Sequence, residues 1–328
     1  MAAAVRPPYP PLTAGLGGLP RIIPDVVISA IFIALFLGLA AANMMILLAN
    51  KRRRHRFPIS GMLYGLCMAR VTTLTLRIAW ATAPRNTRLG LAASIFVNCG
   101  VVLLYVANLV FAQRVLRARQ PPLGWHPALR VLVWAAYACI VASLVMAITS
   151  AVWNAYTVPD DVRAKLLCRA LLQAASTMLL VAAGLPLLLL ALATLLPRRD
   201  DEEAFGRGSM LAKMLVLALS ALLCVAIAGF KASTAWAPAR LISAPAWYHG
   251  PAPFYLFLFT MELVDLTLLA ASRVDQRFHV PDGSSKPGDY SRGRRLSEAS
   301  SKREIAAVSR RHDEDKMDSP REPGQGIL

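Results

Sequence analysis

Charged residues are scarce in this sequence. Asp, Glu, Lys and Arg make up 17% of the 328 residues, whereas about a quarter of an average soluble domain is charged. Hydrophobic residues make up 56% of the chain, which is more than a water-soluble core of this size absorbs. The shortage of charge therefore excludes an ordinary soluble protein and indicates the lipid bilayer as the main partner.

Acidic residues are fewer than basic ones, 19 against 36 Lys and Arg, so the formal net charge is +17. A nucleic-acid-binding protein concentrates such charge in one basic domain with aromatic side chains between the basic ones. Here the basic residues lie at the ends of apolar runs and in the C-terminal tail. This distribution argues against a nucleic-acid partner and favours contact of the loops and tail with anionic lipids.

Histidine and cysteine are too few and too scattered to suggest a catalytic centre. The sequence contains no GxSxG, Walker or HExxH motif. Five cysteines are expected to pack as small residues rather than to form disulfides. Five histidines lie outside the expected membrane spans and predict neither a zinc site nor haem ligands within them: His55, His126, His249, His279 and His312. We expect no enzymatic activity, cofactor or metal.

Long apolar runs are abundant, and seven of them approach the roughly 20 residues that a helix needs to cross a bilayer. The expected fold is all-α, a polytopic transmembrane bundle of seven spans. No cleavable signal peptide is expected, so the first span serves as the membrane signal. An external segment (1–22) is expected before the helical domain (23–272), and a disordered cytoplasmic tail (273–328) after it. The spans are expected at 26–49, 59–81, 89–112, 131–152, 169–196, 211–235 and 253–271.

The distribution of Lys and Arg predicts the orientation of these spans. Most of the 36 basic residues fall in the first, third and fifth loops and in the tail, with KRRRHR at 51–56 the densest run. Cytoplasmic loops carry such an excess, so the N-terminus is expected outside and the C-terminus inside. We expect the plasma membrane rather than an internal membrane.

The second span carries two arginines, Arg70 and Arg77, each of which costs about 2.5–3.5 kcal/mol near a helix centre. If this run did not span, every later helix would reverse, and the third loop would place its arginines outside. The charge distribution therefore predicts that it spans, with partners that offset its charge.

The seventh span supplies such partners. Arg70 and Arg77 share one helix face, and Glu262 and Asp265, three residues apart, share another. Arg70 and Glu262 both fall near the middle of their spans, which predicts a bridge from Arg70 to Glu262 or Asp265. This intramembrane charge cluster is either a structural clamp for the second span or a site for a polar ligand, ion or proton.

Two further features lie outside the spans. Trp236, Trp247, Tyr248 and Tyr255 around the sixth loop indicate an aromatic belt at the interface or, alternatively, the lip of a ligand site. In the tail, Ser297 follows two arginines and one leucine, a pattern typical of basophilic kinase sites, so Ser297 is a candidate phosphosite.

Four strings carry a family resemblance. They are GMLYGLCMARVTTLTLRIAWATAPRN (61–86), GWHP (124–127), PAWYHGPAPFYLFLFTMEL (245–263) and RVDQRFHVPDGSSKPGDYS (273–291). With them the chain resembles, over about 20–291, a family of fungal multi-spanning membrane proteins that has no assigned activity. The resemblance implies membrane placement and no particular chemistry. A more distant similarity of plan links the chain to the fungal lipid-translocating exporters.

Two functions are compatible with this sequence. A receptor-like or sensor protein would use the charge cluster to respond to an external small-molecule or lipid ligand and the tail to signal inside. A transporter or lipid-translocating protein would use the same charges to pass a polar group. A scaffold for other membrane proteins is a third alternative.

Overall fold

The computed structural model describes residues 7–52, 57–158, 161–197, 202–281 and 283–291. These residues are largely helical, and the β-type pairing among them is one isolated bridge between Thr13 and Leu241. The chain divides into two compact units, Met1–His279 and Val280–Leu328. The long helices of the described residues all belong to the first unit.

Seven helical segments in the first unit are long and apolar enough to cross a membrane: Ile22–Arg52, Ile59–Thr82, Thr87–Arg119, Pro127–Tyr156, Val162–Leu195, Met210–Trp236 and Pro251–Ala271. The all-α, seven-span class is therefore confirmed, and the protein is an integral, multi-pass membrane protein. Spans one, two, four, five and six are formed by α1 (Val27–Arg52, after η1, Ile22–Val26), α2 (Ile59–Thr82), α6 (Pro127–Tyr156), α7 (Val162–Leu195) and α8 (Met210–Trp236).

The third and seventh spans are composite. The third consists of α3 (Thr87–Cys99) and α4 (Val102–Arg119), separated at Gly100 and Val101. The seventh consists of α9 (Pro251–Phe254), the π-helix η3 (Tyr255–Thr260) and α10 (Met261–Ala271). Between and after the spans lie the short helices α5 (Pro121–Gly124), η2 (Trp247–His249) and α11 (Val274–Arg277).

Most spans begin and end close to the expected positions, and the largest differences are the end of the third span, at Arg119 rather than 112, and the start of the fifth. The fifth was expected to begin at 169, but α7 begins at Val162 because the Asp161 side chain caps it, accepting a hydrogen bond from the Ala164 N–H at 3.1 Å. Its first turns therefore include basic residues that were expected in a loop. The helix continues through Pro186.

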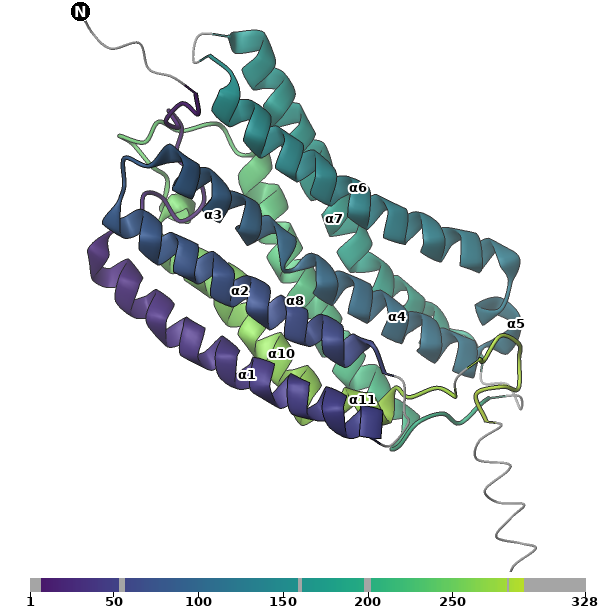
Figure 1. The fold of residues 1–328 in the computed structure, drawn as a ribbon. Coiled ribbons are helices and arrows are strands. Elements are labelled where there is room, and N and C mark those ends of the chain that lie inside the picture. Colours follow the sequence, from purple (N-terminus) through teal and green to yellow (C-terminus); the bar gives the residue numbers. More distant parts are fainter. Residues whose placement is uncertain (1–6, 53–56, 159–160, 198–201, 282, 292–328) are drawn as a thin grey trace, which may run out of the picture. The chain divides into compact units, whose positions relative to one another are not determined.

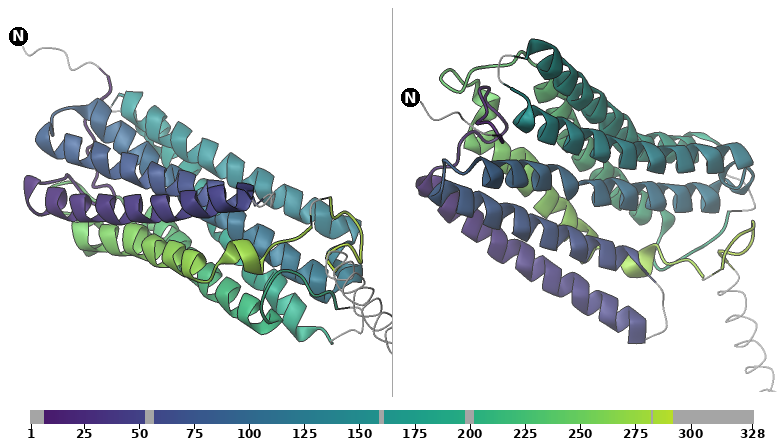
Figure 2. Two further views of the ribbon diagram at one scale, coloured as in Figure 1. Left: turned by 60° about the horizontal axis from the view of Figure 1, so that its bottom comes forward. Right: turned by 45° about the horizontal axis from the view of Figure 1, so that its top comes forward.

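The third span is the most buried of the seven, and α4 packs against α2, α6, α7 and α8. Around it, α1 packs against α2 and α10, α2 against α3, α3 against α6, α6 against α7, and α8 against α7 and α10 (Figure 1). In both views of Figure 2 the long helices run along a common direction. Every other span therefore has access to lipid on one side, while α4 is enclosed.

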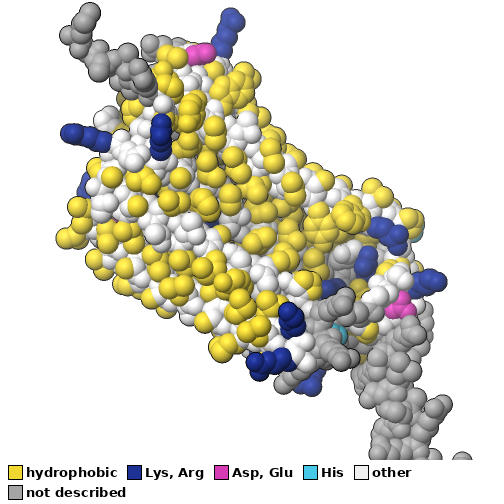
Figure 3. All heavy atoms as spheres, viewed as in Figure 1, with side chains coloured by type: hydrophobic (Ala, Val, Ile, Leu, Met, Phe, Trp, Pro, Cys, Tyr) yellow, Lys and Arg dark blue, Asp and Glu magenta, His cyan; other side chains and the backbone are white. Residues whose placement is uncertain are grey.

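The surface of the first unit matches a bilayer. Figure 3 shows a face on which hydrophobic side chains cover the middle, while Lys and Arg gather towards the two ends. Large apolar side chains are exposed on several helices, among them Met45 (65% exposed), Trp134 (69%) and Leu222 (54%). In water such a surface would drive aggregation, whereas hydrocarbon solvates it.

The segment 7–21 folds across one end of the bundle, and we call it the cap (Figure 1). The Tyr9 N–H donates to the Ala155 carbonyl at the end of α6, and the Ala14 N–H donates to the Arg240 carbonyl in the loop after α8. The cap thus joins elements that are far apart in the sequence.

At the opposite end of the bundle, the loop before α8 and the helix α4 both donate hydrogen bonds to the segment after α10. The Arg207 N–H donates to the Gln276 carbonyl at 2.9 Å, and the Arg114 guanidinium donates to the Phe278 carbonyl at 2.6 Å. Arg273 adopts a left-handed conformation, with φ of 50°, that turns the chain from α10 into α11.

The second unit is described only over its first part. In it the Asp289 carboxylate accepts hydrogen bonds from the backbone N–H groups of Ser285 and Lys286, both at 2.9 Å, which form a turn. Of the tail expected at 273–328, residues 273–281 and 283–291 are described and include α11, whereas the candidate phosphosite Ser297 lies outside the described residues.

Candidate functional site

Arg70 and Glu262 form a two-pronged ion pair in the centre of the bundle. Arg70 Nε donates to Glu262 Oε2 and Arg70 Nη2 to Glu262 Oε1, both at 2.5 Å. Both side chains are fully buried. Two parallel charge-assisted hydrogen bonds are the strongest arrangement available to a guanidinium and a carboxylate. They fix α2 against the seventh span, where Arg70 was expected to find its partner.

The remaining donor of Arg70 is directed at the break in the third span. Arg70 Nη1 lies 3.0 Å from the Val97 carbonyl oxygen and 3.4 Å from that of Phe96. Both residues belong to the last turn of α3, whose carbonyls have no partner within the helix. A Cβ atom on Gly100 would lie 3.0 Å from Arg70 Cζ, so glycine at this position lets the guanidinium approach the backbone.

A third buried charge, that of Lys231, lies against the same break in the third span. Lys231 on α8 is 8% exposed, and its Nζ donates to Asn98 Oδ1 at 3.1 Å and to the Val97 carbonyl at 3.4 Å. Lys231 was not singled out from the sequence, although it lies within the expected span 211–235. Its position within an apolar run, rather than after it, is the signal that identifies it as a buried charge.

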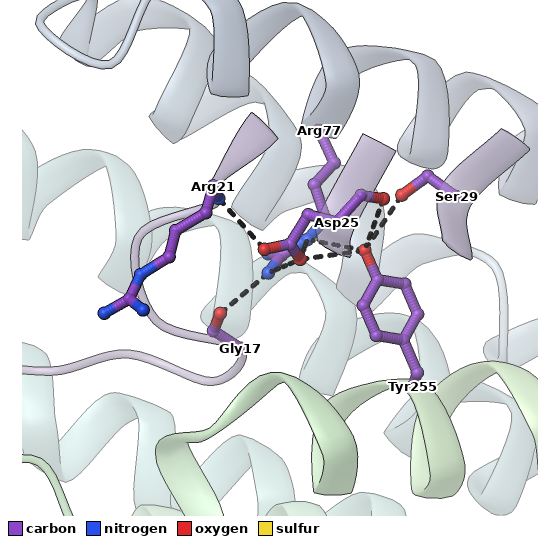
Figure 4. Close-up of polar contacts among 6 residues, drawn as sticks. All are labelled: Gly17, Arg21, Asp25, Ser29, Arg77 and Tyr255. Atoms are coloured by element: carbon purple, nitrogen blue, oxygen red, sulfur yellow. Dashed lines mark hydrogen bonds and ion pairs between the residues drawn. The ribbon is translucent and has the colours of Figure 1, made fainter. Parts of the chain in front are cut away.

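Arg77 has a different partner from the one expected. Figure 4 shows its guanidinium against Asp25, at the start of the first span, with Nη2 and Nε at 2.7 and 3.1 Å from Asp25 Oδ1. Tyr255 Oη donates to the same oxygen at 2.9 Å and lies 3.2 Å from Arg77 Nε and 2.9 Å from Ser29 Oγ. Asp25 and Arg77 are 3% and 4% exposed. This network joins the first, second and seventh spans.

Arg77 also holds the cap. Its Nη2 donates to the Gly17 carbonyl at 2.7 Å, and its guanidinium lies 4.3 Å from the centroid of the Phe254 ring. Gly17 has φ of +78°, and a Cβ there would come within 2.7 Å of the Phe254 ring. Only glycine combines this backbone conformation with so close an approach.

Asp265 does not contact either arginine. Its Oδ2 accepts a long hydrogen bond of 3.5 Å from the Cys224 thiol on α8, and its side chain is fully buried. Three residues of helix rotate a side chain by about 60° and advance it by about 4.5 Å, so Asp265 faces α8 while Glu262 faces α2.

Of the four residues in the expected cluster, the structure therefore brings together Arg70 and Glu262. Arg77 and Asp265 each lie in a separate network, and Asp25 and Lys231 are further members of the buried charge set. Asp25 was missed because it lies immediately before the first expected span, 26–49, where only the residues within the spans were considered as buried charges. The available signal was that Asp25 at the start of the first span and Arg77 near the end of the second lie at the same end of two neighbouring helices.

The aromatic residues of the sixth loop lie beside a small pocket. Trp247 and Tyr248 line a space of about 230 Å³ together with Phe230 and the hydroxyl-bearing residues Ser233 and Thr234 of α8. Next to them the His249 ring accepts a hydrogen bond from the Ala246 N–H at 3.2 Å. Burial of the ring, and then the positive charge of Arg240, lower the pKa of His249 below its usual 6.5.

Two buried ion pairs and the lysine at the break are the main charged features inside the described bundle. Among the residues described, no group of three or more His, Cys, Asp or Glu side chains is placed to bind a metal ion. Comparison of the chain with protein-family models, with curated proteins and with solved structures finds no match. The buried charges are therefore the features of this protein that bear on its function.

Proposed function

We propose that the protein is a receptor-like membrane sensor in which a ligand at the cap end changes how α2 is held. The observation that carries this proposal is the position of Arg77, which bonds the cap at Gly17, the first span at Asp25 and the seventh span at Tyr255. Two turns along the same helix, Arg70 bonds Glu262. A change at the cap is thus transmitted through one rigid helix to the centre of the bundle.

The chemistry of Arg77 suggests the class of ligand. A guanidinium binds carboxylates and phosphates through paired hydrogen bonds. A ligand that carries such a group, on a small molecule or a lipid, competes with Asp25 for Arg77 and releases the cap. Such a ligand shifts the equilibrium only as far as it prefers the released state over the capped one.

Orientation and location belong to the same proposal. The excess of Lys and Arg in the odd-numbered loops and the tail supports an external cap and a cytoplasmic C-terminus, with the plasma membrane as the site of action. Membership of the fungal membrane-protein family that the sequence resembles is likewise proposed.

The test separates a functional charge from a structural clamp. Glu262→Gln keeps the shape of the side chain and removes its charge, and Thr267→Val on the exposed side of α10 is the matched control. Each variant is expressed in a deletion strain of the host, with the amount in the membrane measured alongside transcriptional responses to external carboxylated and phosphorylated compounds. Glu262→Gln leaves Arg70 buried without its counter-charge, so the variant should be less stable than the wild type. We expect enough of it to accumulate in the membrane to show the loss of a response that Thr267→Val restores.

Two outcomes count against the sensor. If Glu262→Gln is degraded while its charge-neutral double variant with Arg70→Met accumulates and responds, the pair is a clamp. If deletion of the gene leaves every response unchanged, no sensing role is left for the protein.

A transporter or lipid-translocating protein is the second candidate, and the break in the third span favours it. Interrupted helices whose free carbonyls meet charged side chains at membrane depth are typical of transporter sites. Here the break at Gly100 exposes the Phe96 and Val97 carbonyls to Arg70 and Lys231. Purified protein in vesicles that moves labelled lipids or organic anions would favour transport, and flat traces with an intact host response would favour sensing.

A further inference from the structure

A second polar cluster lies between α4, α8 and α10. It contains four oxygen atoms that make no hydrogen bond within the described part of the chain. The side chains that carry them are at most 1% exposed. Buried polar atoms of native proteins almost always have a partner, so four such atoms in one region require an explanation. The atoms are Tyr105 Oη, Asn108 Oδ1, Ser220 Oγ and Asp265 Oδ1.

Two of the four side chains, Asn108 and Asp265, bond Cys224. Asn108 Nδ2 donates to Cys224 Sγ at 3.2 Å, and the thiol donates to Asp265 Oδ2 at 3.5 Å. Ser220 lies one turn before Cys224 on α8, and its hydroxyl acts on the Asp265 carboxyl group as a hydrogen-bond donor would, although the two groups do not reach standard hydrogen-bond geometry. Tyr105, one turn before Asn108 on α4, acts electrostatically on both Cys224 and Asp265. The four side chains therefore lie in the region where α8 packs against both α4 and α10.

Among the described residues, no cationic side chain forms a hydrogen bond or ion pair with Asp265. The described groups that act on the Asp265 carboxyl are Ser220, Cys224 and Glu262, none of which is cationic. Arg70 is fully engaged by Glu262 and the α3 carbonyls. An ionised carboxylate this deep in a membrane protein is costly unless a positive charge neutralises it.

We propose that Asp265, Ser220, Asn108 and Tyr105 form an intramembrane binding site for one sodium ion. The donor set is one carboxylate and three neutral oxygens, which are the hard ligands that such cations prefer. A single carboxylate balances a single positive charge, which argues for a monovalent rather than a divalent ion. A proton on Asp265 is the alternative that also balances the charge, whereas a water molecule alone would leave the charge in place.

The proposed sodium site does not depend on the sensor function, but it lies next to Glu262, the partner of Arg70. Asp265 follows Glu262 by one turn of α10, so an ion bound at Asp265 adds to the forces that hold the seventh span against α4 and α8. Sodium binding is expected whether the protein senses or transports.

The test uses the full-length chain in lipid nanodiscs. The thermal midpoint of unfolding is measured as NaCl replaces choline chloride at constant ionic strength, and radioactive sodium binding is measured at equilibrium. Because a ligand of the native state stabilises it by mass action, we expect a saturable rise of the midpoint with Na⁺ and one bound ion per chain. A midpoint that choline supports equally well, or that responds to pH and not to Na⁺, overturns the proposal.

Three variants locate the ion. Asp265→Asn keeps the side-chain shape and is expected to abolish sodium binding and the midpoint shift. Ser220→Ala is expected to weaken sodium affinity by about tenfold or more and remains informative if Asp265→Asn does not fold. Thr267→Val, on the exposed side of α10, is expected to bind sodium normally. Normal binding by Asp265→Asn, or by Ser220→Ala, contradicts the assignment.

Discussion

Arg77 and Asp25, 52 residues apart in the sequence, form a buried ion pair with a 2.7 Å contact between Nη2 and Oδ1. The pair ties the start of the first span to the second. It explains how a helix with two arginines stays in a bilayer, because each arginine has a carboxylate of its own. Arg77 pairs with Asp25 at the start of the first span, and Arg70 pairs with Glu262 on the seventh.

Breaking this pair on one side is expected to destabilise the protein strongly. Asp25→Asn leaves Arg77 buried without a counter-charge, which costs about 3–5 kcal/mol for a buried pair. The thermal midpoint of the purified protein should fall, and the cap amides of Tyr9 and Ala14 should exchange hydrogen faster.

The control for this prediction is the double variant Asp25→Leu with Arg77→Met, which removes both charges. We expect it to recover much of the lost midpoint, because apolar replacement of a buried ion pair is often tolerated. A single Asp25→Asn variant as stable as the wild type would show that the pair is dispensable.

Glycine at the break in the third span is expected to be necessary. Gly100→Ala places a Cβ 3.0 Å from Arg70 Cζ and 3.1 Å from Nε, so the guanidinium must move away from Glu262. The expected result is a lower thermal midpoint, with a loss on the order of 1–3 kcal/mol as for other overpacked sites.

The matched control is Gly184→Ala on α7, where an added Cβ meets nothing within 4 Å. Because alanine has the higher helix propensity, this variant should be as stable as the wild type or slightly more so. Equal midpoints for Gly100→Ala and Gly184→Ala would contradict the packing of Arg70 against the break.

Acid is expected to weaken the structure at the sixth loop. The folded protein holds the pKa of His249 below 6.5, so the unfolded chain binds a proton more readily than the folded one. The contribution of His249 to stability is therefore complete above about pH 6.5 and is lost as pH falls through the folded pKa.

This effect is measured by comparing thermal midpoints of the wild type and His249→Gln between pH 8 and pH 5. Glutamine cannot take up the proton, so the difference between the two should shrink or reverse at low pH. Parallel curves over the whole range would mean that His249 does not titrate differently on folding.

The sequence predicts the spans well because each depends on local hydropathy. The second span is the exception, since its mean hydropathy of 1.2 is the lowest of the seven. Its assignment came from the distribution of charge in the loops, and the structure agrees because Arg70 and Arg77 are neutralised by buried carboxylates.

Partner choice within the bundle was harder to predict. The bridge from Arg70 to Glu262 followed from matching depths in two spans. Asp265 has nearly the same depth, and only the rotation of α10 about its own axis decides that it faces α8 and Cys224. A sequence that fixes depth does not by itself fix helix rotation, which is set by the packing of all seven spans.

The break at Gly100 likewise had no decisive local signal. Glycine lies within other spans that stay helical, for example Gly184 in α7. What distinguishes Gly100 is the guanidinium of Arg70 against it, a contact between segments about 30 residues apart. Local propensity cannot reveal such a contact.

The central claim is that the arginine-bearing α2 crosses the bilayer, which makes the number of spans odd. Epitope tags at the two ends of the chain, probed in intact and in permeabilised cells, test this most directly. We expect the N-terminal tag to be accessible from outside and the C-terminal tag only after permeabilisation. Both tags on the same side of the membrane would contradict the claim.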